Sequence, residues 1–280
     1  MRVRLSSVLL VLAALALGAG ITAAAVLYAG FYDVAATRQH LAATYELLQI
    51  GLRESIQRHA RGIEVPPLGD PGQVGRGLVL YRQHCVQCHG APGVPPEPFA
   101  LGLTPLAKNF ALAARERRPA ELYWVVRNGI KMTGMPAWEF RLAESDLWAV
   151  VAGLEALAMM TPAEYAERAR ALPSNASALS AEPPPGAPAD PRRGKRALSQ
   201  YACTMCHVIP GVVGAENPVG PPLERMALRQ YIAGMLPNTP ENMARWLREP
   251  QAVNPRSAMP NLGVSERDAH DMAAYLYTLQ

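Results

Sequence analysis

Hydrophobic residues form one unbroken run near the N-terminus, from Val8 to Tyr32, and two arginines precede it. A helix of about 20 apolar residues spans the hydrocarbon core of a bilayer. A cleaved signal peptide is the alternative, with Ala23-Ala24-Ala25 as its cleavage site, but the run continues well past that point. We therefore expect residues 1–34 to be an uncleaved transmembrane anchor. The arginines on its N-terminal side predict that everything after Tyr32 is exported.

Hydrophobic residues recur at helical spacing in the next segment, and this pattern predicts a helix from about Ala35 to Gly62. The positions are Leu41, Tyr45, Leu48 and Leu52. A Pro- and Gly-rich stretch from Val65 to Gly72 breaks the pattern. Residues 35–69 are therefore expected to form a helical stalk and a connector.

The rest of the chain divides into two similar modules, residues 70–172 and 191–280, on either side of a linker rich in Pro, Ala and Ser at 173–190. Each module has a short helix, a Pro/Gly-rich loop, a middle helix, a Met-Pro pair and a final amphipathic helix. No segment shows the alternation typical of strands. The pattern predicts an all-α fold with two small helical domains in tandem behind the anchor.

Start and stop signals give the bounds of the later helices. The middle helices are expected at Pro119–Asn128, ended by Gly129, and at Pro240–Glu249, ended by Pro250. Thr239 is a suitable N-cap for the second of these, with proline at the first helical position. The final helices are expected to begin near Ser145 and Ser265.

Composition adds one exclusion and one strong signal. The net charge is +4, and the basic residues are scattered, which excludes a clustered nucleic-acid surface. The chain has 4 cysteines. All of them lie in two Cys-x-x-Cys-His pentapeptides, residues 85–89 and 203–207, and this spacing is the attachment signal of c-type haem.

Two thiols at this spacing can both bond one porphyrin, and the histidine that follows can then bind the iron. A redox dithiol is the first alternative, but it does not need that histidine and would not recur in two modules. A shared zinc site is the second, but the two pairs lie in modules separated by a linker. The sequence predicts two covalently bound haem c groups, held by Cys85, Cys88 and His89 and by Cys203, Cys206 and His207.

The sixth iron ligand decides whether such a site is closed, and a methionine thioether is the candidate in each module. Met135 and Met259 each precede a proline in the loop between the middle and final helices. Met132 is the rival in the first module. In the second module the poorer rivals are Met226, Met235 and Met243.

Four other histidines and one tryptophan have weaker claims to a role. Ligation by His40 or His59 is an unfavoured alternative to the methionines. His84 is expected on an exposed side of its helix, although it adjoins Cys85. Trp138 is expected at the haem, either bonded to a propionate through its indole N–H or packed on the haem edge.

With these motifs in place, both modules resemble class I cytochrome c domains, and the whole resembles membrane-anchored dihaem cytochromes c. The resemblance implies that the first and last helices of each module cross through a glycine and aromatic residues. It also implies that a proline carbonyl orients the proximal histidine. Pro221 matches that role in the second module. Five prolines compete for it in the first, so none is assigned there: Pro92, Pro95, Pro96, Pro98 and Pro105. The crossing residues would be Gly77, Tyr81 and Trp148, and Gly194, Tyr201 and Tyr275.

The resemblance implies a membrane-tethered electron carrier, not itself an enzyme, that relays single electrons between respiratory complexes on the periplasmic side of a bacterial cytoplasmic membrane. A terminal oxidase is one expected partner. The cytochrome subunit of a membrane-bound dehydrogenase is a close alternative. A dihaem peroxidase is an alternative of another class, and the Met-Pro loop in both modules argues against the open iron site that it needs. A haem-based gas sensor is disfavoured because no signalling module follows.

Overall fold

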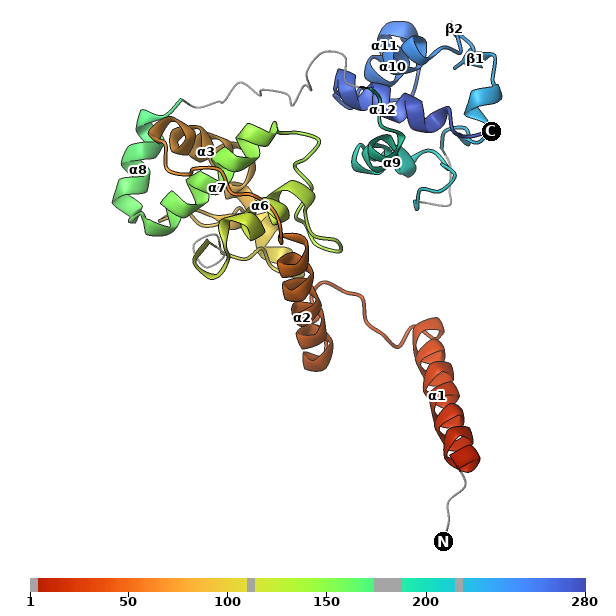
Figure 1. Cartoon of the computed structure of the whole chain (residues 1–280), viewed down its shortest axis with the longest axis horizontal. Coiled ribbons are helices and arrows are strands. Elements are labelled where there is room, and N and C mark those ends of the chain that lie inside the picture. Colours follow the sequence, from red (N-terminus) through yellow and green to blue (C-terminus); the bar gives the residue numbers. More distant parts are fainter. Residues whose placement is uncertain (1–4, 110–113, 174–187, 215–218) are drawn as a thin grey trace.

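The N-terminal apolar run forms the long helix α1, Leu5–Tyr28, in the computed structural model, which describes residues 5–109, 114–173, 188–214 and 219–280 (Figure 1). The helix has 24 residues, and none of them is buried. Its mean hydropathy over a window of 18 residues is 2.4. It is long and apolar enough to cross a membrane. The two arginines expected to orient it lie outside the described residues.

Helix α2, Ala42–His59, is shorter than the sequence predicts. The residues before it form turns, and the Asp33 side chain accepts a hydrogen bond from the amide of Ala35 (2.9 Å). The expected apolar face is mostly in solvent, with Leu48 53 % exposed, whereas Ile56 near the C-terminal end is fully buried. This end of α2 packs on the first module, where the His59 ring stacks on Trp124 with centroids 5.3 Å apart.

The first module is built on α3 (Pro71–His84) and α7 (Glu144–Met159), with α6 (Pro119–Asn128) packed on α7. Asp70 caps α3 by accepting from the amide of Gln73 (2.8 Å). Two short elements, α4 (Val86–His89) and η1 (Pro98–Gly102), lie in the connection between α3 and α6.

Helix α8, Pro162–Ala171, was not predicted, although its signal is in the sequence. Thr161 and Glu164 form a capping box at its start, the Ser/Thr-x-x-Glu pattern of a helix N-terminus. Tyr165 attaches the helix to the first module by burying its ring in the core.

The second module is held by the packing of α9 (Pro191–Gln200) and α10 (Pro240–Arg248) on α12 (Glu266–Leu276). Thr239 and Ser265 cap α10 and α12 as the sequence predicts. The remaining short elements are η2 (Cys203–Met205), η3 (Met226–Leu228) and α11 (Pro250–Val253).

A small antiparallel hairpin departs from the otherwise helical fold. Its strands are β1, Tyr231–Ile232, and β2, Leu236–Pro237. Two residues are too few to show a period of two, so the sequence offered no strand signal. Gly234, with φ of +69°, allows the chain to reverse between the strands.

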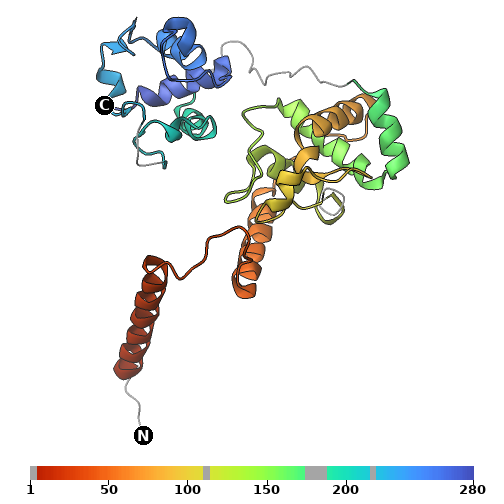
Figure 2. The same cartoon turned by 180° about the vertical axis from the view of Figure 1, so that it is seen from behind.

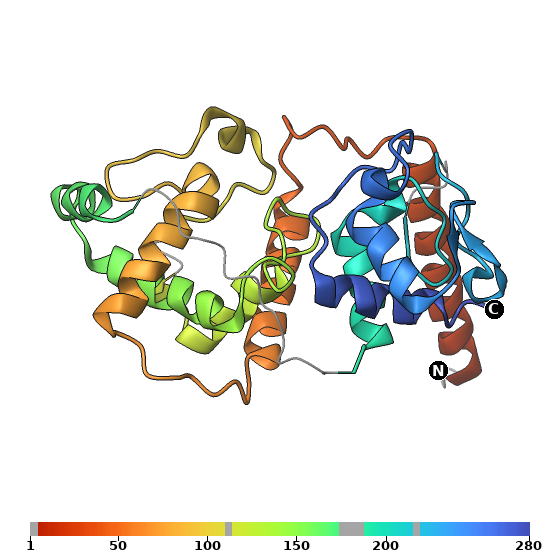
Figure 3. The ribbon, with the colours of Figure 1, turned by 90° about the horizontal axis from the view of Figure 1, so that it is seen from above.

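Helix α3 crosses α7 in the first module, and α9 crosses α12 in the second (Figure 2). A glycine lies at the close approach in each crossing. A Cβ on Gly77 of α3 would lie 1.8 Å from the carbonyl oxygen of Ala149 in α7, and one on Gly194 of α9 would lie 1.9 Å from that of Asp271 in α12. The backbones therefore approach closely enough to exclude any side chain. Viewed from above, the two helical modules lie side by side (Figure 3).

Candidate functional site: the two Cys-x-x-Cys-His turns

The first pentapeptide is a single helical turn at the end of α3. Cys85 ends α3, and its carbonyl accepts from the amides of Cys88 (3.1 Å) and His89 (3.0 Å). Gly90 then reverses the chain with φ of +64°. The hydroxyl of Tyr81, buried in α3, donates to the carbonyl of Gly90 (2.6 Å), so the core of the module holds the turn in place.

The second pentapeptide forms a similar turn by a different route. Ala202 adopts a left-handed conformation, with φ of +56°, between the end of α9 and Cys203. The amide of His207 donates to the carbonyl of Cys203 (3.0 Å), as in the first module. The amide of Gly220 donates to the carbonyl of Cys206 (2.8 Å) and brings the following loop against the turn.

Both histidines are oriented by a backbone carbonyl. Nδ1 of His207 lies 2.8 Å from the carbonyl oxygen of Pro221, the residue that the resemblance named. Nδ1 of His89 lies 2.7 Å from the carbonyl oxygen of Lys108. Because a carbonyl can only accept, each Nδ1 carries the proton, and each Nε2 keeps the lone pair that can bind a metal. Sequence reasoning missed Lys108, since any residue can present a carbonyl.

The four thiols are free, and none forms a disulfide. Cys85 and Cys203 pack against the hydrophobic cores of their modules. Burial raises the pKa of Cys85 to about 12 and that of Cys203 to about 11, so both are neutral thiols at neutral pH. Among the described residues no three His, Cys, Asp or Glu side chains gather as a metal-ion site.

The two Met-Pro loops share one local structure. The amide of Met135 donates to the hydroxyl of Thr133 (3.0 Å), and that of Met259 donates to the hydroxyl of Ser257 (3.1 Å). Both methionines are partly buried against the core of their own module. Each hydroxyl two residues earlier thus fixes the turn that presents the methionine.

The rival methionines lie in other surroundings. Met132 is 95 % exposed. Met235 is exposed on the hairpin of the second module. Met226 and Met243 are buried in the core of that module.

His84 corrects one expectation. It is half-buried and lies against Trp138, with ring centroids 5.0 Å apart, so it is not on an exposed side of α3. Burial lowers the pKa of His84. Trp138 also packs against the core of the first module. The two histidines considered as alternative iron ligands have other neighbours: the Tyr32 hydroxyl lies 2.7 Å from Nδ1 of His40, and His59 stacks on Trp124.

These donors fit a c-type haem. Each module offers two free thiols and a histidine on one turn, a lone pair at Nε2 and a thioether held in a loop beside the apolar core. A haem attached at the turn would extend that apolar surface. Gly220 supports the fit, because a Cβ there would lie 2.4 Å from Cε1 of His207 and push the ring from its position.

Comparison with known proteins agrees with this chemistry. Residues 72–152 match the model of the family described as cytochrome C oxidase, cbb3-type, subunit III, and residues 191–280 match that of the family cytochrome c. The cytochrome c oxidase subunit 2 of Alkalihalophilus pseudofirmus is 33% identical over 89 residues, which are 31% of this chain and 25% of that protein. The chain thus spans about a quarter of that relative's length.

Among solved structures, the reducing HAO-like protein complex of Kuenenia stuttgartiensis aligns over 78% of this chain and 99% of its own, with 19% identity and a TM-score of 0.27. That likeness is too low to carry an argument. The two family matches together cover both modules and both pentapeptides. The chain therefore belongs to the cytochromes c and carries two cytochrome c domains in tandem behind an N-terminal helix suited to anchor it in a membrane.

Proposed function

We propose that this chain is a dihaem electron-transfer protein, tethered by α1 and relaying single electrons between respiratory complexes. The observation that carries the proposal is the repeated donor set: in each module a Cys-x-x-Cys-His turn with its histidine oriented by a carbonyl, and a Met-Pro loop with the methionine partly buried. A haem with two protein ligands on its iron supplies one-electron chemistry without an open site for substrate.

Each group of residues has a distinct task in this proposal. The cysteines of each turn would form the thioether bonds to the haem, and His89 and His207 would bind its iron through Nε2. Met135 and Met259 would supply a thioether as the second iron ligand, which raises the potential. Pro221 keeps the His207 ring from rotating, and Trp138 would pack at the haem edge in the first module. The proposed domains are residues 70–172 and 191–280, with 173–190 as a linker.

The proposed acceptor is a terminal oxidase. Both the family matched by residues 72–152 and the relative from Alkalihalophilus pseudofirmus are named as oxidase subunits, which supports this choice. Covalent haem attachment in bacteria takes place outside the cytoplasmic membrane, so both modules are proposed to lie on the periplasmic or outer side.

Spectroscopy of the purified full-length holoprotein tests the proposal. We expect two haems per chain and two low-spin signatures of His–Met ligation. Met135→Ala and Met259→Ala should each remove one signature and lower the potential of one haem. The matched controls Met132→Ala and Met235→Ala alter exposed methionines and should leave both signatures unchanged. A high-spin haem and consumption of peroxide by the unaltered protein would contradict the proposal and indicate a peroxidase.

The choice of acceptor has its own test. The reduced protein in detergent should be oxidised rapidly by a solubilised terminal oxidase, with a rate that increases with the oxidase concentration. Reduction by a membrane dehydrogenase together with no oxidation by the oxidase would instead assign the chain to a dehydrogenase complex.

A further inference from the structure

Phe140 belongs to the first module by sequence and to the second by packing. It lies in the loop between α6 and α7, yet its side chain is only 7 % exposed, and it is part of the second module's hydrophobic core. The guanidinium of Arg193 from α9 lies 4.9 Å from the centre of its ring. An aromatic ring from one module thus fills an apolar site in the other, beneath a cation that is attracted to its face.

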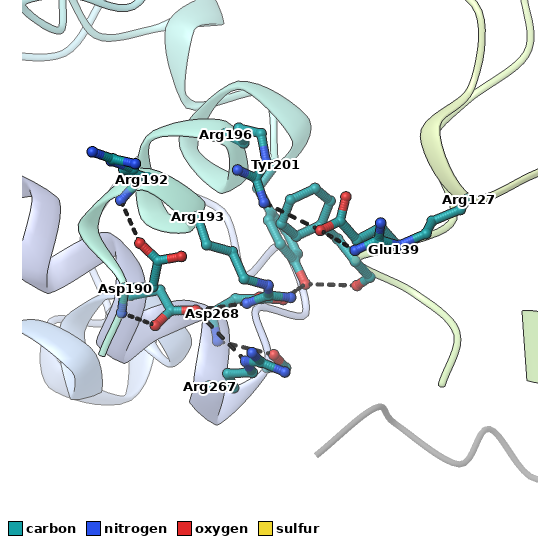
Figure 4. A network of polar contacts seen from close by, with 12 residues as sticks. Arg127, Glu139, Asp190, Arg192, Arg193, Arg196, Tyr201, Arg267 and Asp268 are labelled. Carbon is teal, nitrogen blue, oxygen red and sulfur yellow. Dashed lines mark hydrogen bonds and ion pairs between the residues drawn. The ribbon is translucent and has the colours of Figure 1, made fainter. Parts of the chain in front are cut away.

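The loop that carries this ring contacts the second module at two further points. Figure 4 shows Tyr201 of the second module and Glu139 of this loop at the junction. The hydroxyl of Tyr201 lies 3.1 Å from the carbonyl oxygen of Phe140, and the guanidinium of Arg141 donates to the carbonyl of Gln200 (2.8 Å). Arg141 also lies over the ring of Tyr201, 5.8 Å from its centre. These contacts join consecutive residues of one loop to consecutive residues at the end of α9.

A charged side chain completes the junction. Glu139 accepts from Arg196 of the second module (3.3 Å) and from Arg127 of its own module (3.2 Å). Only about an eighth of the Glu139 side chain is exposed (12%), so it is screened less than a surface carboxylate. Glu139 therefore connects α6 of the first module to α9 of the second.

Each side of the junction is hydrogen-bonded to its own module. On the first module, the amides of Trp138 and Glu139 donate to carbonyls of α6, at 3.2 and 3.0 Å. On the second, the Tyr201 hydroxyl donates to Asp268 (2.7 Å), which also pairs with the buried Arg193. A cavity of about 380 Å³ lies beside these contacts, and residues of both modules line it, among them Glu139 and Tyr201.

The junction lies between the two candidate sites along the chain. Met135 precedes Phe140 in the same loop, and Tyr201 is the second residue before Cys203. We propose that Glu139, Phe140 and Arg141 form an interdomain latch that seats the first module in the second and holds the two Cys-x-x-Cys-His turns in one fixed relation. The latch itself rests on packing. Its consequence, a constant path for an electron between the two sites within one chain, rests on the proposed function.

Hydrogen exchange and small-angle X-ray scattering of the full-length holoprotein in detergent test the latch. Phe140→Ala removes the anchoring ring and should speed exchange of the amides at 197–203 by about tenfold or more, with an increase in the radius of gyration. Phe99→Ala is the matched control, because Phe99 is an exposed phenylalanine of the same module (61%). It should change neither quantity.

A second variant covers the case in which Phe140→Ala does not fold. Arg141 is exposed, so Arg141→Ala leaves the core intact and removes the bond to Gln200; it should give a smaller change of the same sign. Unchanged exchange at 197–203 and an unchanged radius in both variants would overturn the latch. Haem content and ligation spectra from the same samples separate the two proposals. An unaltered protein that lacks two haems or the His–Met spectra would count against the proposed function alone.

Discussion

A Cβ atom on Gly220 would lie 2.4 Å from Cε1 of His207, so the histidine ring packs directly against this glycine and leaves no room for a side chain. The next residue, Pro221, supplies the carbonyl that accepts from Nδ1 of the same ring (2.8 Å). Two consecutive residues therefore control the ring: one leaves room for it, and the other fixes its rotation. The first module orients His89 differently, through the carbonyl of Lys108 (2.7 Å).

Replacing Gly220 should disturb the second site alone. In Gly220→Ala the new methyl group must displace the His207 ring, because 2.4 Å is well inside van der Waals contact. We expect a weakened His207–iron bond, seen as a loss of one of the two low-spin haem signatures. Gly102→Ala is the control, since a Cβ there meets nothing within 4 Å, and its spectrum should match that of the unaltered protein. An unaltered spectrum in Gly220→Ala would contradict this role.

The helix crossing at Gly77 predicts a large loss of stability from a small change. In Gly77→Ala the methyl group would lie 1.8 Å from the Ala149 carbonyl oxygen, and α3 and α7 must separate. We expect the first module to lose about 1–3 kcal/mol or more in unfolding free energy, as for overpacked cores. Denaturant unfolding, followed by circular dichroism, measures this loss.

Gly75 is the control, because it lies in the same helix. A Cβ there meets only a Leu172 methyl carbon at 3.6 Å, an ordinary contact. Gly75→Ala should therefore be neutral or stabilise the helix by up to about 1 kcal/mol. Equal effects of the two substitutions would show that the close crossing does not limit stability.

Arg193 predicts a strong effect of an unpaired buried charge. Its side chain is 9% exposed and pairs with Asp268 and with Asp271 (2.7 Å), both nearly buried. In Arg193→Met both carboxylates lose their nearest cation, and a broken buried pair costs about 3–5 kcal/mol. Thermal unfolding of the second module should shift accordingly. Arg192→Met, one residue earlier and exposed, should shift it little.

Tyr201 predicts a loss of stability at alkaline pH. The pKa of Tyr201 is raised from 10.0 to about 12, mainly by burial and next by the hydrogen bond to Asp268. Between these values the unfolded chain loses the phenolic proton while the folded chain keeps it. Stability from this group is therefore complete below pH 10 and falls as the pH rises toward 12.

Denaturant unfolding at a series of alkaline pH values measures this slope. Tyr201→Phe cannot titrate at this position, so its stability should fall less steeply over the same range. Parallel slopes for the two proteins would mean that other groups account for the alkaline loss.

Local signals carried much of the fold. The sequence predicted α6 at its observed bounds, because proline at the first position and Gly129 after the last define a helix without reference to the rest of the protein. The caps at Thr239 and Ser265 act over three residues and are equally local. The capping box of α8 was also local, and it could have been found from Thr161 and Glu164.

The candidate sites divide in the same way. The two pentapeptides and the Met-Pro pairs were identified from residue types at fixed spacing, because these groups need a particular side chain. The glycines at the helix crossings came from the resemblance to class I cytochrome c domains. The partner of His89 was not, because a backbone carbonyl has no residue signature and only the path of the loop brings Lys108 to the ring.

The sequence by itself determined that the chain has an apolar N-terminal helix and two modules, each with its own Cys-x-x-Cys-His turn and candidate methionine. Only the tertiary structure decided where Phe140 belongs. Tyr201 lies in the core of its own module and donates to Asp268 of α12, and the same hydroxyl lies 3.1 Å from the carbonyl oxygen of Phe140 in the other module. Sequence periodicity reports which face of an element is buried, but not which module buries it, since burial depends on contacts between residues far apart in the chain.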